Sequence, residues 1–218
     1  MNALDLVTKF VNGNDTVYHV FPTTMFVTKY PDNFDEEFEY IEKLPYRQEM
    51  SYNENCKSVD PYILKHKELS KLKDFFYESI KKYAKDVITA RHELIVTNSW
   101  INKNEPGVGH PIHLHPNSIV SGTFCLRQNS TMPPTQYYNR YIPLIKVQME
   151  SQNSMNAEHI SVPMVPGDLI LFPSDIMHSV SVNVSNETRY SLSFNTFSNE
   201  LGSNEALSYA SWQTNVND

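Results

Sequence analysis

Cysteine is scarce in this sequence. Among its 218 residues only Cys56 and Cys125 are cysteines, and they do not form a C-x-x-C pair. A disulfide framework and a cysteine-ligated zinc cluster are therefore not expected. This usage is typical of a reducing compartment, so we expect a cytoplasmic protein.

The sequence also lacks an excess of positive charge and any long apolar run. It contains 18 Lys and Arg against 25 Asp and Glu, which gives a formal net charge of −7. Nucleic-acid binding without sequence preference needs a basic surface, so no nucleic-acid partner is expected. No apolar stretch reaches the roughly 18 residues of a membrane span, and the first residues do not resemble a signal peptide.

Glycine is sparse as well, with 6 residues, whereas 40% of the chain is hydrophobic and 12% aromatic. This composition is typical of a packed globular protein. We find no repeat or linker, and the length suits one β-barrel or jelly roll. The sequence therefore predicts one domain over residues 1–218, with 1–92 as helical and strand support and 93–200 as the jelly-roll core.

The first 92 residues mix strand and helix patterns. Apolar residues repeat every three or four positions through two segments, which predicts amphipathic helices that pack on a sheet. We expect a strand over Val17–Val27 interrupted at Pro22, a short helix between Asp32 and Pro45, a loop over Tyr46–Val59, and a long helix from about Pro61 to Asp86.

After about residue 92 short β-rich runs alternate with turn residues, which is typical of a sandwich or jelly roll. We predict a mainly β fold with N-terminal helices, a double-stranded β-helix (jelly roll, cupin-like). The expected strands are Leu94–Ile101, Ser118–Leu126, Ile142–Met149, Leu169–Phe172, His178–Val184 and Arg189–Phe197.

Three histidines form a candidate metal site. His113 and His115 are two residues apart, so in a strand their side chains share a face. His178 comes 63 residues later, beside a strand that could lie opposite the first. Two imidazoles on one face suit iron, zinc or copper. A lone histidine is more often structural, so the prediction depends on all three.

Arg189 adds a second chemical feature, because it lies with Ser191 on one face of an otherwise apolar strand. An arginine inside a barrel is costly unless an anion receives it. Its planar fork suits a small dicarboxylate, to which a serine hydroxyl adds one hydrogen bond. The alternative is an outward-facing arginine that pairs with a surface acid such as Glu187.

With these residues the sequence resembles the 2-oxoglutarate- and iron(II)-dependent oxygenase superfamily, above all the prolyl-hydroxylase-like branch found in bacteria and phages. The matching stretches cover most of residues 20–30 and 98–197. They are FPTTMF, SWINKNEPGVGHPIHLHPNSIVSGTFCL, VPGDLILFPSDIMHSV and ETRYSLSFN.

The resemblance implies an enzyme, a non-haem iron dioxygenase with Fe(II) and 2-oxoglutarate as cofactors. His113, His115 and His178 would hold the metal, while Arg189 and Ser191 would take the distal carboxylate of 2-oxoglutarate. The enzyme would use O₂, convert 2-oxoglutarate to succinate and CO₂, and hydroxylate a small molecule or peptide, for example a prolyl residue. The substrate and the oligomeric state are not written in the sequence.

One feature departs from the superfamily pattern, which usually has Asp or Glu two residues after the first histidine. Here that position is His115. A carboxylate from elsewhere could complete the triad, or His110 could be a ligand with His115 behind it. We favour 113, 115 and 178, because the i, i+2 pair needs no special loop geometry.

Two rival functions remain open. A cupin-like three-His dioxygenase would act without 2-oxoglutarate and explains His115, but it leaves Arg189 without a dicarboxylate. A non-catalytic jelly-roll module would bind metal only for stability. Several nearby positions fit either a site role or ordinary packing, namely Trp100, Asn102, Ser121, Thr123, Asn195 and the loop Gln128–Tyr141.

Overall fold

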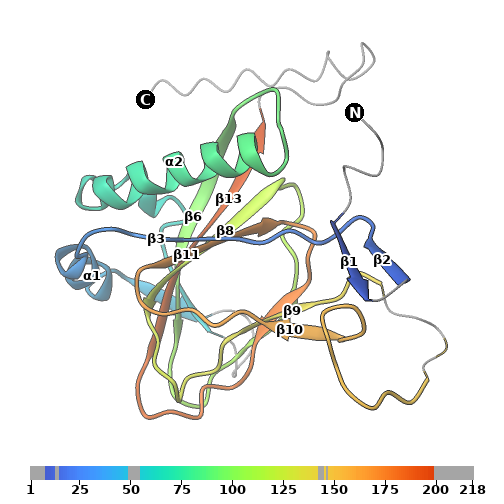
Figure 1. Ribbon diagram of the computed structural model, residues 1–218. Helices are drawn as coiled ribbons and strands as arrows, with labels where there is room; N and C mark the ends of the chain where they lie inside the picture. Colours follow the sequence, from blue (N-terminus) through green and yellow to red (C-terminus); the bar gives the residue numbers. More distant parts are fainter. Residues whose placement is uncertain (1–7, 13–14, 49–54, 142–144, 146, 199–218) are drawn as a thin grey trace.

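The computed structural model describes residues 8–12, 15–48, 55–141, 145 and 147–198. Two antiparallel β-sheets face each other, and two helices lie beside the larger sheet (Figure 1). The larger sheet has the order β3 (Phe26–Lys29), β11 (Asp168–Pro173), β8 (Val120–Arg127), β13 (Arg189–Ser198), β6 (Leu94–Asn104), β5 (Cys56–Ser58) and β4 (Tyr46–Gln48). The smaller has the order β10 (His159–Ser161), β9 (Thr135–Tyr138), β12 (His178–Val180) and β7 (His110–His113).

From β6 onward the chain passes back and forth between the two sheets. Strands β6, β8, β11 and β13 belong to the larger sheet, whereas β7, β9, β10 and β12 belong to the smaller. This alternation is the double-stranded β-helix that the sequence predicts. A separate hairpin of β1 (Thr8–Asn12) and β2 (Asp15–His19) lies beside the smaller sheet (Figure 1).

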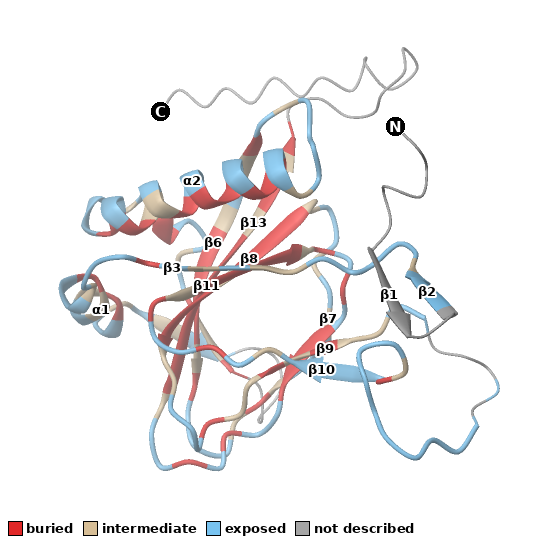
Figure 2. Cartoon of the chain, viewed as in Figure 1, coloured by how far each residue is buried: buried red, intermediate tan, exposed pale blue. Residues whose placement is uncertain are grey.

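The long helix α2 spans Ser70–Asp86 and covers the larger sheet. Its apolar stripe is buried as expected, and Phe76 stacks on Phe194 of β13 at a ring-centroid distance of 5.2 Å. Figure 2 shows this buried face turned to the sheet and the opposite face exposed. Among the described residues, no helix is long and apolar enough to cross a membrane.

The start of the long helix and the form of the shorter one differ from the prediction. The side chain of Asp60 does accept the N–H of Tyr62, but two short 3₁₀ turns, Ile63–Lys65 and Lys67–Leu69, precede α2. The shorter helix α1 spans Asp35–Glu42, and the side chain of Asn33, not Asp32, accepts the N–H of Asp35. The expected strand from Val17 is two strands, β2 and β3, that end and begin on either side of Pro22.

Two stretches were assigned wrongly. Tyr46–Val59 was expected to be loop, yet β4 and β5 extend the larger sheet from it. Ile142–Met149 was expected to be a strand, but the described residues in it belong to none, and the strands here are β9 and β10. These strands are three or four residues long, too short for an alternation of apolar and polar side chains to mark them in the sequence.

Strand β7 contains an irregularity that shapes the interior. His113 pairs with His178 of β12, and His110 pairs with Val180. The step between the two pairs is three residues in β7 but only two residues in β12. Such a bulge shifts the alternation of side chains. His110 and His113 consequently both face the space between the sheets, although their spacing is odd.

Candidate active site

The three predicted metal ligands come together between the sheets. His113 ends β7, His178 begins β12, and His115 lies just beyond β7. One ring nitrogen from each can be chosen so that all three lie within 4.8 Å of one another. In the part of the chain that the structure describes, this is the only group of three or more His, Cys, Asp or Glu residues with such geometry.

His115 reaches the group by a route that strand alternation does not predict. It is not part of a strand, and its backbone N–H donates to the carbonyl of Ser174, 2.9 Å away. Its ring stacks on Trp100, with centroids 5.6 Å apart, and on His178 at 5.0 Å. The loop anchor and these two rings therefore orient its imidazole.

Backbone carbonyls orient the other two rings. His113 Nδ1 donates to Pro111 O at 2.8 Å, and His178 Nδ1 donates to Ile176 O at 3.0 Å. Each bond leaves Nε2 with its lone pair for a metal, as is usual for ligating histidines.

The nitrogen spacing also fits a metal ion. His115 Nε2 lies 3.1 Å from His178 Nε2. Two imidazole nitrogens bound at right angles to one ion at about 2.1 Å would lie about 3.0 Å apart. The residues present therefore fit a divalent metal of the type that imidazole prefers.

The electrostatic setting keeps the imidazoles neutral. Burial, then positive neighbours, lower the pKa of His115 to about 3, and burial and His113 lower that of His178 to about 4. Burial also lowers the pKa of His113. Neutral rings are what metal coordination requires, so protons do not compete for these nitrogens near pH 7.

Arg189 lies in the interior, which excludes the outward-facing alternative. Arg189 is 2% exposed. Its guanidinium donates to Gln128 Oε1 at 3.2 Å and to Thr135 Oγ1 at 3.3 Å. Glu187 instead accepts from Asn129. Among the described residues no carboxylate forms an ion pair with Arg189, so a buried cation is left with two neutral acceptors for five N–H donors.

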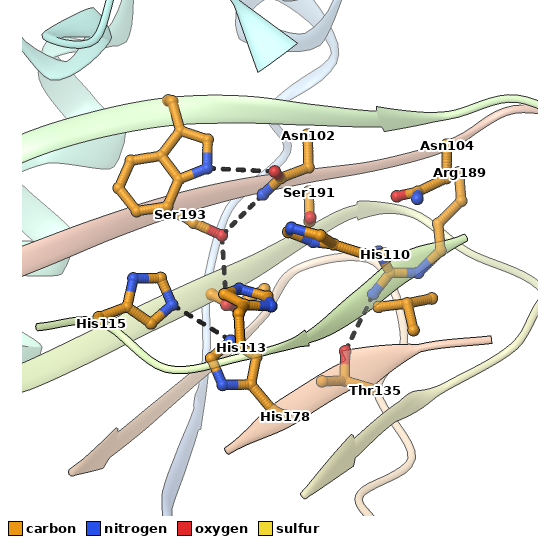
Figure 3. A pocket seen from close by; sticks show the side chains of 13 residues that line it. Asn102, Asn104, His110, His113, His115, Thr135, His178, Arg189, Ser191 and Ser193 are labelled. Atoms are coloured by element: carbon orange, nitrogen blue, oxygen red, sulfur yellow. Dashed lines mark hydrogen bonds between the residues drawn. The ribbon is translucent and has the colours of Figure 1, made fainter. Parts of the chain in front are cut away.

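A cavity joins the histidines to Arg189 and takes residues from both sheets (Figure 3). Its volume is about 20 Å³, enough for about one water molecule. No Asp or Glu is among its lining residues, which are Trp100, Asn102, Asn104, His110, His113, His115, Thr123, Thr135, His178, Val180, Arg189, Ser191 and Ser193.

Hydrogen bonds fix one wall of this cavity. Trp100 Nε1 donates to Asn102 Oδ1 at 3.1 Å, and Asn102 Nδ2 donates to Ser193 Oγ at 3.0 Å. Trp100, Asn102 and Thr123, which the sequence left open between packing and site roles, thus line the cavity. Ser121 and Asn195 do not line it, and Ser121 Oγ donates to Asn195 Oδ1 at 2.9 Å.

Sequence reasoning missed Asn104 and Thr135 and left His110 as an alternative only. Asn104 pairs with Arg189 across β6 and β13, so its place follows from the strand register, which the sequence does not show. Thr135 lies on β9, inside the stretch 128–141 that the sequence leaves open between a site role and ordinary packing. The buried Arg189 was the available signal, because it requires nearby acceptors.

Comparison with protein families agrees with this arrangement. Residues 98–195, from β6 through most of β13, match the family described as "Putative 2OG-Fe(II) oxygenase". Over these residues the chain is similar to the 2OG-Fe(II) oxygenases. The resemblance seen in the sequence is thereby confirmed, including its implication that the chain is an enzyme with Fe(II) and 2-oxoglutarate as cofactors.

Solved structures of such oxygenases share the fold. The non-haem α-ketoglutarate-dependent epimerase SnoN from nogalamycin biosynthesis has a TM-score of 0.61 at 12% identity, over 82% of this chain and 80% of SnoN. A prolyl hydroxylase from Trichoplax adhaerens has 0.58 at 10%, over 80% and 83%. A Pseudomonas putida prolyl-4-hydroxylase has 0.54 at 12%, over 80% and 94%. A search of curated protein sequences finds no match.

Proposed function

We propose that this oxygenase oxidatively decarboxylates 2-oxoglutarate to succinate and CO₂ and hydroxylates a C–H bond of its substrate. Fe(II) would be held by His113, His115 and His178, and the distal carboxylate of 2-oxoglutarate by Arg189 and Ser191. The observation that carries this proposal is the buried Arg189, which has no carboxylate partner among the described residues and lines the same cavity as the three histidines.

The protein groups would bind and orient, while the metal and 2-oxoglutarate supply the oxidising chemistry. Arg189 offers a planar fork that matches a carboxylate, and Ser191, 2% exposed on the same face of β13, offers a hydroxyl. A dicarboxylate would neutralise the buried guanidinium, and this attraction is stronger in a buried site than at the surface. The hydrogen-bonded wall of Trp100, Asn102 and Ser193 would keep that site rigid.

The substrate is proposed to be a small molecule or a peptide, with a prolyl or another amino-acid side chain as the group oxidised. Support comes from the two prolyl hydroxylases among the structures of similar fold. SnoN, an epimerase of the same fold, illustrates that the fold alone does not fix the substrate.

A three-His dioxygenase that needs no 2-oxoglutarate is the second candidate. It is favoured by the lack of any carboxylate among the described residues that line the cavity. It gives no role to the buried Arg189. Oxidation of a substrate in the absence of 2-oxoglutarate would select it, whereas bound metal without any turnover would select the non-catalytic binding module.

The test is an anaerobic titration of Fe(II) and then 2-oxoglutarate into metal-free protein, followed by the visible charge-transfer absorption of the iron-bound keto acid. We expect a band in wild type, no band in His178→Ala, and in Arg189→Ala a 2-oxoglutarate Kd raised at least thirtyfold, the effect of breaking a buried charge pair.

Matched controls are His159→Ala on the exposed strand β10 and Arg127→Ala, whose guanidinium pairs with Glu42 at the surface. Both should retain the wild-type band. Bound Fe(II) without a band in wild type would contradict the proposal.

A further inference from the structure

His110 is a cavity residue that the proposed function leaves without a role. The bulge in β7 turns it inward, and its ring stacks on that of His113 with centroids 4.1 Å apart. Its strand partner Val180 pairs in turn with Thr135, the hydroxyl that accepts from Arg189. Figure 3 shows the ring between His113 and Arg189, on the path that joins the two ends of the cavity.

The free space along this path is too small for the cosubstrate. The cavity volume of about 20 Å³ admits about one water molecule, whereas 2-oxoglutarate has a five-carbon chain with a carboxylate at each end. If 2-oxoglutarate is to reach from the histidines to Arg189, a lining side chain must move.

Most side chains that line the cavity are held in position by hydrogen bonds. Trp100, Asn102 and Ser193 share hydrogen bonds, Asn104 Nδ2 donates to Gly109 O at 3.2 Å, and Arg189 bonds to Gln128 and Thr135. His110 differs, because its ring nitrogens form no hydrogen bond with any residue that the structure describes. The ring contact with His113 would be lost if the ring moves.

The position of His110 also leaves room for movement. Strand β7 is at the edge of the smaller sheet, and within the part of the chain that the structure describes no further strand pairs with its outer side. His110 is half-buried, whereas Arg189 across the cavity is buried. Rotation of its side chain toward the open edge would vacate the path without breaking a backbone pair.

We propose that the His110 side chain occupies the 2-oxoglutarate site in the unliganded protein and is displaced when the cosubstrate binds. This inference rests on the proposed function, because it assumes that the cosubstrate spans the histidines and Arg189. Displacement lowers affinity by the stacking that is lost, which corresponds to about two- to tenfold in Kd.

The test measures 2-oxoglutarate binding by calorimetry with Mn(II) in place of Fe(II), so that no turnover is needed. His110→Ala should bind 2-oxoglutarate about two- to tenfold more tightly than wild type. His110→Phe retains a ring of similar size without nitrogens and should bind no more tightly than wild type. His159→Ala, which removes an exposed histidine from the same sheet, should be unchanged.

The remaining outcomes separate the inference from the function on which it rests. Equal affinity in wild type and His110→Ala, or weaker binding in both the Ala and Phe variants, would overturn the displacement of His110 alone. Loss of Mn(II) from His110→Ala would instead make His110 a ligand and overturn it too. Binding of Mn(II) without any binding of 2-oxoglutarate, in wild type and His110→Ala alike, would overturn the proposed function itself.

Discussion

At the scale of single residues, Arg189 shows how a functional group costs stability. A guanidinium that is fully buried with two neutral acceptors loses hydration without a compensating charge. We expect Arg189→Met to raise the free energy of unfolding of the metal-free protein by about 1–4 kcal/mol, while 2-oxoglutarate binding is lost. Urea unfolding in the absence of metal and 2-oxoglutarate measures the first effect.

Arg127→Met is the control for Arg189→Met, because it removes a guanidinium that pairs with Glu42 at the surface. It should change the free energy of unfolding by less than about 1 kcal/mol. A destabilised Arg189→Met protein would mean that Arg189 is already compensated, and the main argument for a dicarboxylate would fail.

Gly122 on β8 lies where the core has no room for one additional side-chain atom. A Cβ at this position would overlap the ring of Phe194, which is buried on the neighbouring strand β13. We expect Gly122→Ala to lower the free energy of unfolding by about 1–3 kcal/mol, the usual cost of overpacking, as measured by urea titration. In the double variant Gly122→Ala with Phe194→Leu, the loss in free energy of unfolding should be smaller than the sum of the losses in the two single variants. A loss equal to that sum would show that the clash with Phe194 is not the cause.

The clustering of the three candidate histidine ligands could be predicted from the sequence, but the details of the cavity could not. His113, His115, His178 and Arg189 are polar residues next to apolar strands, so their chemistry is visible in the sequence. His110 faces the cavity only because a bulge shifts the alternation of β7. A bulge depends on how two strands pair, which no local pattern encodes.

At the scale of elements, helix α2 illustrates the reliable part of sequence reasoning. Apolar side chains recur every three or four residues over four turns of α2 and form one apolar face. This face is buried against the larger sheet. The short strands β4 and β5 contain no pattern that is repeated several times in this way. Three residues cannot establish a period, so their membership in the sheet appears only in the structure.

Phe76 and Tyr77 of α2 provide a matched pair for measuring this packing. Phe76 is 0% exposed and touches the rings of Phe124 and Phe194, whereas Tyr77 is 37% exposed. We expect Phe76→Ala to lower the free energy of unfolding by about 3–5 kcal/mol. Tyr77→Ala should cost clearly less in the same chemical denaturation experiment, and equal losses would contradict the packing of α2 through its Phe76 face.

At the scale of the whole molecule, the buried histidines couple folding to pH. Burial lowers the pKa of His115 to about 3 and that of His178 to about 4, below the ordinary value near 6.5. Between pH 4 and 6.5 the unfolded chain therefore binds protons at these positions that the folded, metal-free protein does not. The free energy of unfolding is fully retained above pH 6.5 and decreases as the pH falls toward 4.

Each such histidine contributes a slope of up to about 1.4 kcal/mol per pH unit in this window. Urea unfolding of metal-free protein from pH 7.5 to 5 measures the sum, and His178→Gln should reduce the slope by up to one proton. Saturating Mn(II) should raise the free energy of unfolding by nearly the same amount across this window, because the folded imidazoles are already neutral there and protons do not compete with the metal. A stability that does not change between pH 7.5 and 5 would show that the three rings are solvated enough to titrate normally, which is incompatible with a closed metal site between the two sheets.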